Sequence, residues 1–504
     1  MPPQTDARLN AALALTRFGL GAKAGEIDKV ASDPRGWLDQ QIQPEGAPNP
    51  LGRLDSTTGR VRAFLDYQRD LQGVRLAQRA GASMSAPQPT AEMSGGAARL
   101  PERSPPPAPE VGDPDAQAAL DVRRESRQSL ARETAAEFLA RAQLGAETEA
   151  GFAERWALFW ANIFTVSATK FQAAAFVGPY EREAIRPHVF GRFDDLAVAA
   201  TTHPAMLLYL DQVQSIGPNS RAGSRRGAGL NENLAREIME LHTVGADSGY
   251  SQVDVTEFAR ALTGWSIPTN RDARARLSPA AIVDGQSAFV FRAMVHEPGA
   301  RSVLGKRYED GGAEQGQAIL RDLANRPETA KRLARRIAQH FVADDPPASL
   351  VARLESAWIA SQGDMSLVAK ALITSPDAWG PQPVKIKTPY EFVVSAHRAL
   401  GTRPVRLQPL QQSLVQMGQP AFSAPSPEGW PDTAADWAGP DALVKRLNWA
   451  TTVGEAAQHM DPVAVAAGAL GPRLTERSRL AVARAGSRSE ALTLFLMSPE
   501  FQRR

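Results

Sequence analysis

The sequence predicts a mainly α-helical protein, with its helices in a bundle-like or orthogonal array that carries one small β-hairpin. Three observations lead to this fold class. From about residue 116, apolar side chains recur every three or four residues in one segment after another, which is the period of an amphipathic helix. The strand period of two replaces this pattern near 289–308. Cysteine is absent, which excludes a disulfide scaffold and cysteine-ligated metal centres.

The first 115 residues divide into a helical segment and a segment of different composition. Residues 6–20 have a helical pattern that ends at the glycines of "RFGLGA", and Pro34 begins a second short helix. Residues 79–115 are rich in Pro, Ala, Gly and Ser and bury too little apolar surface to offset the entropy of ordering. We therefore predict an N-terminal helical segment, 1–78, and a flexible insert, 79–115, with a peptide-ligand role for "SPPPAP" as an alternative.

A helical core domain is predicted for residues 116–400. Its segment "GFAERWALFWANIFTV" places aromatic side chains at intervals of three and four, which is typical of a helix buried in the core. Within the domain, "SAFVFRAMV" alternates with the strand period, "HEPGA" supplies a turn and "SVLGKRY" returns as the partner strand of the hairpin. Residues 401–504 are predicted to form a C-terminal helical segment that packs on this core.

Charge and hydropathy exclude some classes of partner. The formal net charge of +2 over 504 residues gives no bulk attraction to nucleic acid, and no apolar stretch is long enough for a membrane span. The N-terminus lacks a basic start and has a short apolar run, so it makes a poor signal peptide. These features predict a soluble, cytoplasmic protein without a nucleic-acid partner.

The stretch "NENLAREIMELHT", residues 231–243, combines helical leucine spacing with amides, glutamates and a histidine. On a helical wheel of about 100° per residue, Leu230, Leu234, Ile238 and Leu241 form the core-facing stripe. Glu237 then lies at the edge of that stripe, with Asn233 and Glu240 beside it, so its carboxylate is expected to be partly buried and to need a partner.

Two interpretations of Glu237 remain open. One is a structural tie to Arg260, Arg182 or Arg186, whose loss in Glu237→Ala would cost about 3–5 kcal/mol. The other is a functional pocket in which Asn233, Glu237, Glu240 and His242 act on a substrate.

The motifs of this chain resemble a bacterial family known as domain-of-unknown-function family 1800. The resemblance extends over most of the sequence and rests on segments in the expected order: "RFGLGA", "GPYEREAIRPHVFGRF", "HPAMLLYLDQVQS", "NENLAREIMELHTVG", "GYSQVDVTEFARALTGW", "HEPGARSVLG", "KIKTPYEFVVSAHRALG", "GWPD" and "SPEFQRR". It implies a mostly helical fold and no established activity. Members are often encoded beside family 1501, which looks exported and sulfatase-like. The resemblance thus suggests a family 1501 partner and, as the alternative compartment, the periplasm or export with that partner.

The chain also departs from the family pattern. Where relatives have Phe-Trp-His-Asn-His-Phe, this sequence has "FWANIF", so Ala161 and Ile163 replace two imidazoles. Where relatives have His-Asp, it has His296-Glu297. If those imidazoles bind a metal in relatives, the site is depleted here.

Three function classes follow from the sequence. We favour a binding or maturation partner of an exported family 1501 protein. The alternatives are a structural scaffold and a helical enzyme with a carboxylate general base and an arginine-lined pocket for an anionic substrate. Nucleophile-elbow, Walker and zincin motifs are absent. No cofactor is predicted, and a divalent metal held by carboxylates and imidazoles is the alternative. The candidate catalytic residues are Asn233, Glu237, Glu240, His242, His296 and Arg182.

Overall fold

The N-terminal residues form short helices that pack against the main core. The computed structural model describes residues 4–84, 114–226, 229–269 and 288–504. Its first elements are α1 (Gln4–Leu13), the π-helix η1 (Ala14–Phe18), α2 (Glu26–Val30) and α3 (Pro34–Asp39). Asp33 caps α3 by accepting a hydrogen bond from the Gly36 amide, and Pro34 occupies the first turn as the sequence predicts.

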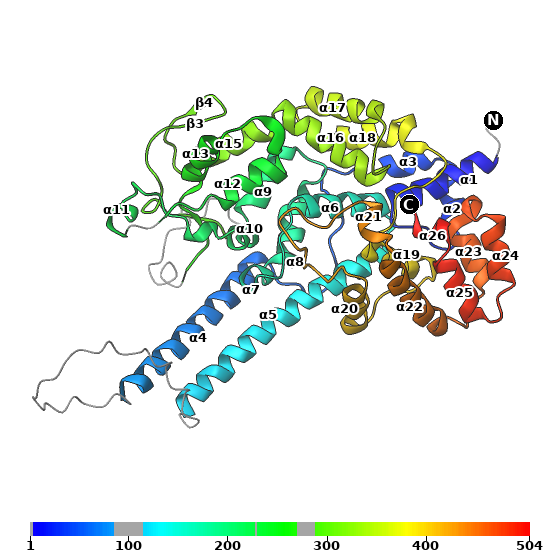
Figure 1. Cartoon of the computed structure of the whole chain (residues 1–504), viewed down its shortest axis with the longest axis horizontal. Helices are drawn as coiled ribbons and strands as arrows, with labels where there is room; N and C mark the ends of the chain where they lie inside the picture. The colour runs from blue at the N-terminus through cyan, green and yellow to red at the C-terminus, as the bar shows by residue number, and fades with distance from the viewer. Residues whose placement is uncertain (1–3, 85–113, 227–228, 270–287) are drawn as a thin grey trace, which may run out of the picture.

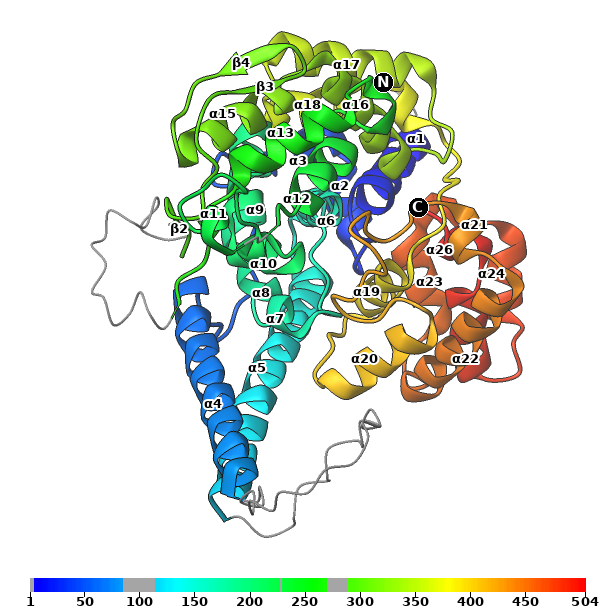
Figure 2. The same cartoon turned by 60° about the vertical axis from the view of Figure 1, so that its left-hand side comes forward.

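Two long helices form an arm that stands away from the rest of the molecule (Figures 1 and 2). They are α4 (Thr57–Met84) and α5 (Pro114–Glu147), which run antiparallel to each other. The ends of the predicted flexible insert, 79–84 and 114–115, are therefore helical. The rest of that predicted insert, 85–113, lies outside the described residues.

The predicted aromatic core helix is confirmed as α6 (Gly151–Ile163), which lies at the centre of Figure 1. Trp156 and Trp160 are fully buried on it, and Trp156 Nε1 donates to the Val189 carbonyl at 2.7 Å. Short elements surround α6: α7 (Phe171–Ala174), α8 (Val177–Pro179), η2 (Tyr180–Ile185), η3 (Arg186–His188), α9 (Phe193–Thr202), α10 (Pro204–Tyr209), η4 (Gln212–Gln214), α11 (Gly223–Arg226), α12 (Asn233–Glu237), η5 (Ile238–His242), η6 (Ala246–Ser248) and α13 (Gln252–Leu262).

A small hairpin is present near the predicted place, but its strands pair differently from the prediction. β3 (Arg301–Val303) pairs with β4 (Lys306–Tyr308) around a tight turn at 304–305. β2 (Val290–Phe291), predicted as the first strand of the hairpin, instead pairs with β1 (Trp265–Ser266). A hairpin of β2 with β3 would need the connection 292–300, whereas the hairpin of β3 with β4 needs only the two residues 304–305. The shorter connection costs less entropy to close.

The second half of the chain is helical and contains two core regions. α15 (Ala313–Ala324), α16 (Pro327–Phe341), α17 (Ala348–Ser361), α18 (Met365–Thr374) and η8 (Pro376–Trp379) share the core of α6. A second apolar core joins Leu20 and Phe138 to the helices at the right of Figure 1. Those are α19 (Pro389–Ala399), α20 (Leu407–Gln416), α22 (Pro440–Ala456), α23 (Pro462–Leu470), α24 (Glu476–Ala483), α25 (Arg488–Leu496) and α26 (Pro499–Gln502). This part of the chain also forms α21 (Ala434–Trp437) and η9 (Gly471–Arg473).

The last residues run back beside the start of α19. Ile386 and Arg503 form an isolated antiparallel bridge, and the Arg504 amide donates to the Lys385 carbonyl at 2.9 Å. This pairing brings the Arg504 side chain to the interface between the two core regions, where its guanidinium is fully buried. Among the described residues, no helix is both long enough and apolar enough to cross a membrane.

Candidate functional site

The helix predicted to carry Glu237 changes its winding in the middle. α12 is followed directly by the π-helix η5, in which the Thr243 amide donates to the Ile238 carbonyl five residues back. The wider π turn rotates the residues that follow it relative to a regular wheel. His242 is therefore fully buried, whereas Leu241, predicted in the core stripe, is only half-buried.

The predicted tie of Glu237 to an arginine is wrong. Glu237 is half-buried, and its carboxylate has no hydrogen bond or ion pair among the described residues. The three arginines proposed as its partners are engaged with other carboxylates: Arg260 with Glu257, Arg182 with Glu137, and Arg186 with Glu154 and Glu181. Burial and the nearby Glu240 carboxylate raise the pKa of Glu237, and Arg236 offsets only part of this effect.

The other predicted site residues do not converge on one pocket. Asn233 is exposed, and Glu240 forms a partly exposed i, i+4 pair with Arg236 at 3.4 Å. His242 lies under the Phe164 ring at 4.8 Å between centroids, and burial lowers the pKa of its imidazole to about 3, so the ring is neutral at pH 7. His296 donates from Nδ1 to the Thr263 carbonyl at 2.8 Å, in a different part of the fold.

A pocket with convergent polar groups lies instead where the two core regions meet. We call it the polar pocket; its volume is about 130 Å³. Its walls come from α6, α5, η2, the end of α16, the start of α19 and the segment 419–432. Polar side chains project into a mostly apolar lining, an arrangement typical of small-molecule sites. The polar lining residues are Arg141, Arg155, Asn162, Thr165, Tyr180, Glu181, His340, Thr388, Tyr390, Glu391, Gln419 and Asp432.

Glu391 is held at this site by the way α19 begins. Thr388 is the N-cap and accepts from the Glu391 amide, while the Glu391 carboxylate accepts from the Thr388 amide at 2.9 Å, which completes a capping box. The same carboxylate also receives Arg504 Nε at 2.9 Å and Arg155 Nη1. Burial alone would raise the pKa of Glu391, but Arg155 and Arg504 reverse this effect and hold the pKa well below its usual range.

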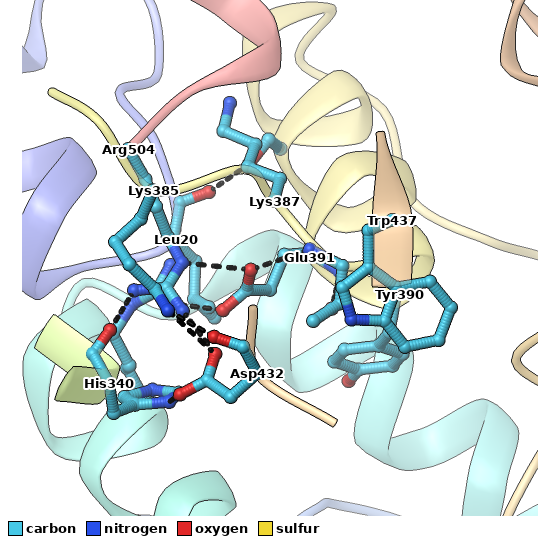
Figure 3. Close-up of polar contacts among 12 residues, drawn as sticks. Leu20, His340, Lys385, Lys387, Tyr390, Glu391, Asp432, Trp437 and Arg504 are labelled. Atoms are coloured by element: carbon cyan, nitrogen blue, oxygen red, sulfur yellow. Dashed lines mark hydrogen bonds and ion pairs between the residues drawn. The ribbon is translucent and has the colours of Figure 1, made fainter. Parts of the chain in front are cut away.

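Beside Glu391, His340 and Asp432 form a hydrogen-bonded pair (Figure 3). His340 Nδ1 lies 2.7 Å from Asp432 Oδ2, and the two side chains are 14% and 16% exposed. Burial lowers the pKa of His340 to about 4, although Asp432 acts in the opposite direction. Burial would raise the pKa of Asp432, but His340, Arg504 and Lys385 together hold it below its usual value. At pH 7 the pair is thus a neutral imidazole that donates from Nδ1 to a carboxylate.

Three buried atoms on this pocket's side chains have no hydrogen-bond partner among the described residues. They are His340 Nε2, Arg155 Nη2 and Arg141 Nε. Arg155 donates Nε to the Gly19 carbonyl at 2.7 Å and Nη1 to Glu391, so Nη2 is its remaining donor group. A buried donor or acceptor without a partner costs about 1–3 kcal/mol, and such groups are rare in native folds.

Sequence reasoning did not select these residues, although it quoted the segments that carry most of them. Tyr180 and Glu181 belong to "GPYEREAIRPHVFGRF", Glu391 to "KIKTPYEFVVSAHRALG" and Asp432 to "GWPD". The signal available in the sequence was the presence of these polar residues within the quoted motifs. His340 lies outside every quoted motif, and nothing in "RRIAQHF" marks it as a site residue.

A comparison with protein families identifies the chain. The family model described as protein of unknown function (DUF1800) matches residues 13–503. The chain belongs to the DUF1800 family. No curated protein and no solved structure matches it. The resemblance to DUF1800 inferred from the motifs is thereby confirmed, and the match covers every segment that lines the polar pocket.

The two positions at which the resemblance led us to expect imidazoles fall at different places. Ala161 lines the polar pocket, whereas Ile163 is buried in the main core. Within the described ranges, no group of three or more His, Asp or Glu side chains is arranged to hold a metal ion. The third departure, Glu297, accepts from the Asn219 amide at 2.8 Å and thus holds a loop.

Proposed function

We propose that this protein is a helical enzyme whose polar pocket binds a small molecule with a carbonyl or carboxylate group. One observation carries the proposal: His340, Arg155 and Arg141 line a single pocket, and each has a buried nitrogen, His340 Nε2, Arg155 Nη2 and Arg141 Nε, that is unpaired among the described residues. A ligand with acceptor oxygens supplies the partners that the two guanidinium groups lack. A cavity of about 150 Å³ accommodates benzene, so the polar pocket suits a group of that size.

His340 is the general base in this proposal. Its Nδ1–H bond to Asp432 fixes the tautomer and leaves the Nε2 lone pair free to accept a proton. The low pKa of His340 keeps the ring in this accepting form throughout the neutral pH range. Once Nε2 takes a proton from a bound water or from the substrate, the Asp432 carboxylate stabilises the resulting imidazolium.

Arg155 is the group that binds the substrate oxygen. Its guanidinium is 1% exposed and is held in place by the Gly19 carbonyl and by Glu391. Donors held in place before the reaction stabilise the negative charge that develops on a carbonyl oxygen. They do so without moving during the reaction, and this preorganisation is usually the largest contribution of such a site to the rate. The carboxylates of the pocket thus position the cation, and the imidazole moves the proton.

The test compares the full-length protein with His340→Gln and with His459→Gln, which changes an exposed histidine. Binding of acetate is measured by ligand-observed NMR, and hydrolysis of p-nitrophenyl acetate is measured by absorbance. We expect His340→Gln to bind acetate nearly as well as the parent and to lose at least about 100-fold in turnover, the usual contribution of a general base. His459→Gln should match the parent in both assays.

Each failure has a separate meaning. Equal turnover by the parent and a folded His340→Gln would contradict the general-base role. Absence of binding by acetate and by the ester would contradict the pocket assignment. A change in stability alone would leave the scaffold role, with the ion pairs around Arg504 as internal ties, as the better account.

The partner role is a second candidate, favoured by the α4–α5 arm. The arm stands out from the body in both views, and Leu120 and Val122 on α5 are 37% and 48% exposed. Exposed apolar side chains on a projecting element suit protein binding. The proposed partner is an exported protein of family 1501, the partner that the motif resemblance suggests. Co-expression and co-purification with that protein should fail for Leu120→Ser/Val122→Ser, and an undiminished yield of complex would contradict the arm's role.

A further inference from the structure

A second pocket adjoins the polar pocket on the side of α5. We call it the apolar pocket; it has a volume of about 230 Å³ and lies between α5, α7 and residues 421–422. Its lining is dominated by Leu130, Ala135, Phe171 and Ala174, and it contains no charged side chain. Apolar cavities of this kind bind apolar groups because burial removes the group's surface from water.

Two aromatic side chains belong to both pockets. Phe138 and Phe422 line the polar pocket and the apolar pocket alike. Their rings meet edge to face, with centroids 5.2 Å apart and an interplanar angle of 79°. On the polar side, the Arg141 guanidinium lies 4.6 Å from the Phe422 centroid and 4.8 Å from that of Phe138. The two rings therefore belong to the lining of both the charged pocket and the apolar pocket.

Phe422 occupies an unusual backbone conformation. Its φ is +50°, in the left-handed region that bulky side chains rarely adopt. The Phe422 carbonyl accepts from the Ala168 amide at 2.6 Å, which holds this conformation. A non-glycine residue in this region stores backbone strain, and such strain is concentrated at ligand clamps and active sites.

We propose that the two pockets form one amphipathic site, in which the substrate's polar head lies at Arg155 and His340 and its apolar tail passes the Phe138–Phe422 wall into the apolar pocket. This inference rests on the proposed function and adds the substrate class: a straight-chain or aromatic carboxylic acid, or its ester. The occupant of the apolar pocket is the tail of the same molecule. Because Phe138 and Phe422 line both pockets, one molecule that spans them is favoured over a separate ligand.

The experiment uses the full-length protein and four probes: acetate, butyrate, hexanoate and octanoate. Dissociation constants come from ligand-observed NMR below the micelle concentration of each acid. We expect affinity to rise by roughly three- to fourfold per methylene added, the increment for burying one methylene group, until the apolar pocket is filled.

Two variants fill the apolar pocket from different helices: Ala135→Leu on α5 and Ala174→Leu on α7. Both should leave the acetate dissociation constant unchanged and reduce octanoate binding to about the level of butyrate. Ala136→Leu, at the next position of α5 with an exposed side chain, is the matched control and should keep the full dependence on chain length.

The outcomes separate the two claims. If acetate binds and longer acids bind no better, the amphipathic site is overturned while the proposed function stands. If the chain-length dependence persists in both filling variants, the tail binds elsewhere and the inference is also overturned. If no acid binds, the proposed function fails and the inference fails with it.

Discussion

His340 Nδ1 and Asp432 Oδ2 lie 2.7 Å apart, although 92 residues separate the two side chains in the sequence. Arg504, from the end of the chain, joins both: it donates Nη1 to the His340 carbonyl, and its Nη2 lies 3.1 Å from Asp432 Oδ1. Lys385 Nζ also binds the Asp432 carbonyl. Asp432 is thus the anion at which α16, the start of α19 and the last residue of the chain meet.

Asp432→Asn should destabilise the protein strongly. The substitution removes the anionic partner of His340 and one of the two carboxylate partners of Arg504, whose side chain is 0% exposed; the other partner is Glu391. Removing one partner of a buried ion pair typically costs about 3–5 kcal/mol because the other charge stays buried. Urea denaturation measures this loss. Asp436→Asn, at an exposed position of α21, is the control and should cost less than about 1 kcal/mol. Similar midpoints for both variants would refute the structural importance of the pair.

The stability contributed by neutral His340 should depend on pH. The pKa of His340 is about 4 in the folded protein, against an ordinary value of 6.5. The unfolded chain therefore takes up the proton first, so stability is full above pH 6.5 and falls as the pH drops toward 4. His340→Gln lacks this proton uptake. The free energy of unfolding of the parent, relative to that of His340→Gln, should thus decrease by on the order of 3 kcal/mol between pH 7 and pH 4. A constant difference over this range would show that the imidazole titrates normally.

Arg186→Leu should be among the most damaging single substitutions. The guanidinium is fully buried and lies 2.6 Å from Glu154 and 2.6 Å from Glu181, themselves 0% and 7% exposed. The substitution leaves two buried carboxylates without this cation, and we expect a loss of at least about 3–5 kcal/mol, or failure to fold. Arg236→Ala removes an arginine that is 37% exposed and should cost less than about 1 kcal/mol. Chemical denaturation, or soluble yield if the variant cannot be purified, distinguishes the two.

Glu237→Gln should raise the melting temperature at pH 7 slightly. The pKa of Glu237 is raised in the folded protein, first by burial and then by Glu240, so the fold favours the uncharged form. Stability linked to this group is greatest at low pH and is lost as the pH rises through the folded pKa. The uncharged amide of Glu237→Gln avoids that loss of stability. The difference in melting temperature between the variant and the parent should therefore vanish below pH 4.

Glu232→Gln is the matched control for Glu237→Gln and should have the opposite sign. The hydrogen bond from Thr256 is the largest cause that lowers the pKa of Glu232. Burial, the next largest, acts in the opposite direction, and contacts to Gln252 and Arg236 lower the pKa further. Loss of these contacts should cost less than about 1 kcal/mol at pH 7. A fall of 3–5 kcal/mol for Glu237→Gln, measured by the same thermal scans, would restore the structural tie that the sequence suggested.

The sequence by itself determined the local structure of most elements. The aromatic spacing on α6 and the capping residues Asp33 and Thr388 specify helices through neighbours three and four positions away. Such local patterns can be predicted from the sequence because the interacting residues lie in one short segment. Membership of the family could also be predicted, since it depends on the order of the motifs and not on their contacts.

Only the tertiary structure decided the polar contacts. The wheel placed Glu237 near the core edge correctly, but it could not choose a partner, and the π turn of η5 moved His242 inward against a regular wheel. The strand at 290–291 pairs with β1, which precedes it in the chain, and not with the strand that follows it. His340, Asp432 and Arg504 are joined over separations of 72 to 164 residues, because the geometry of helix packing, which no local pattern encodes, sets those contacts.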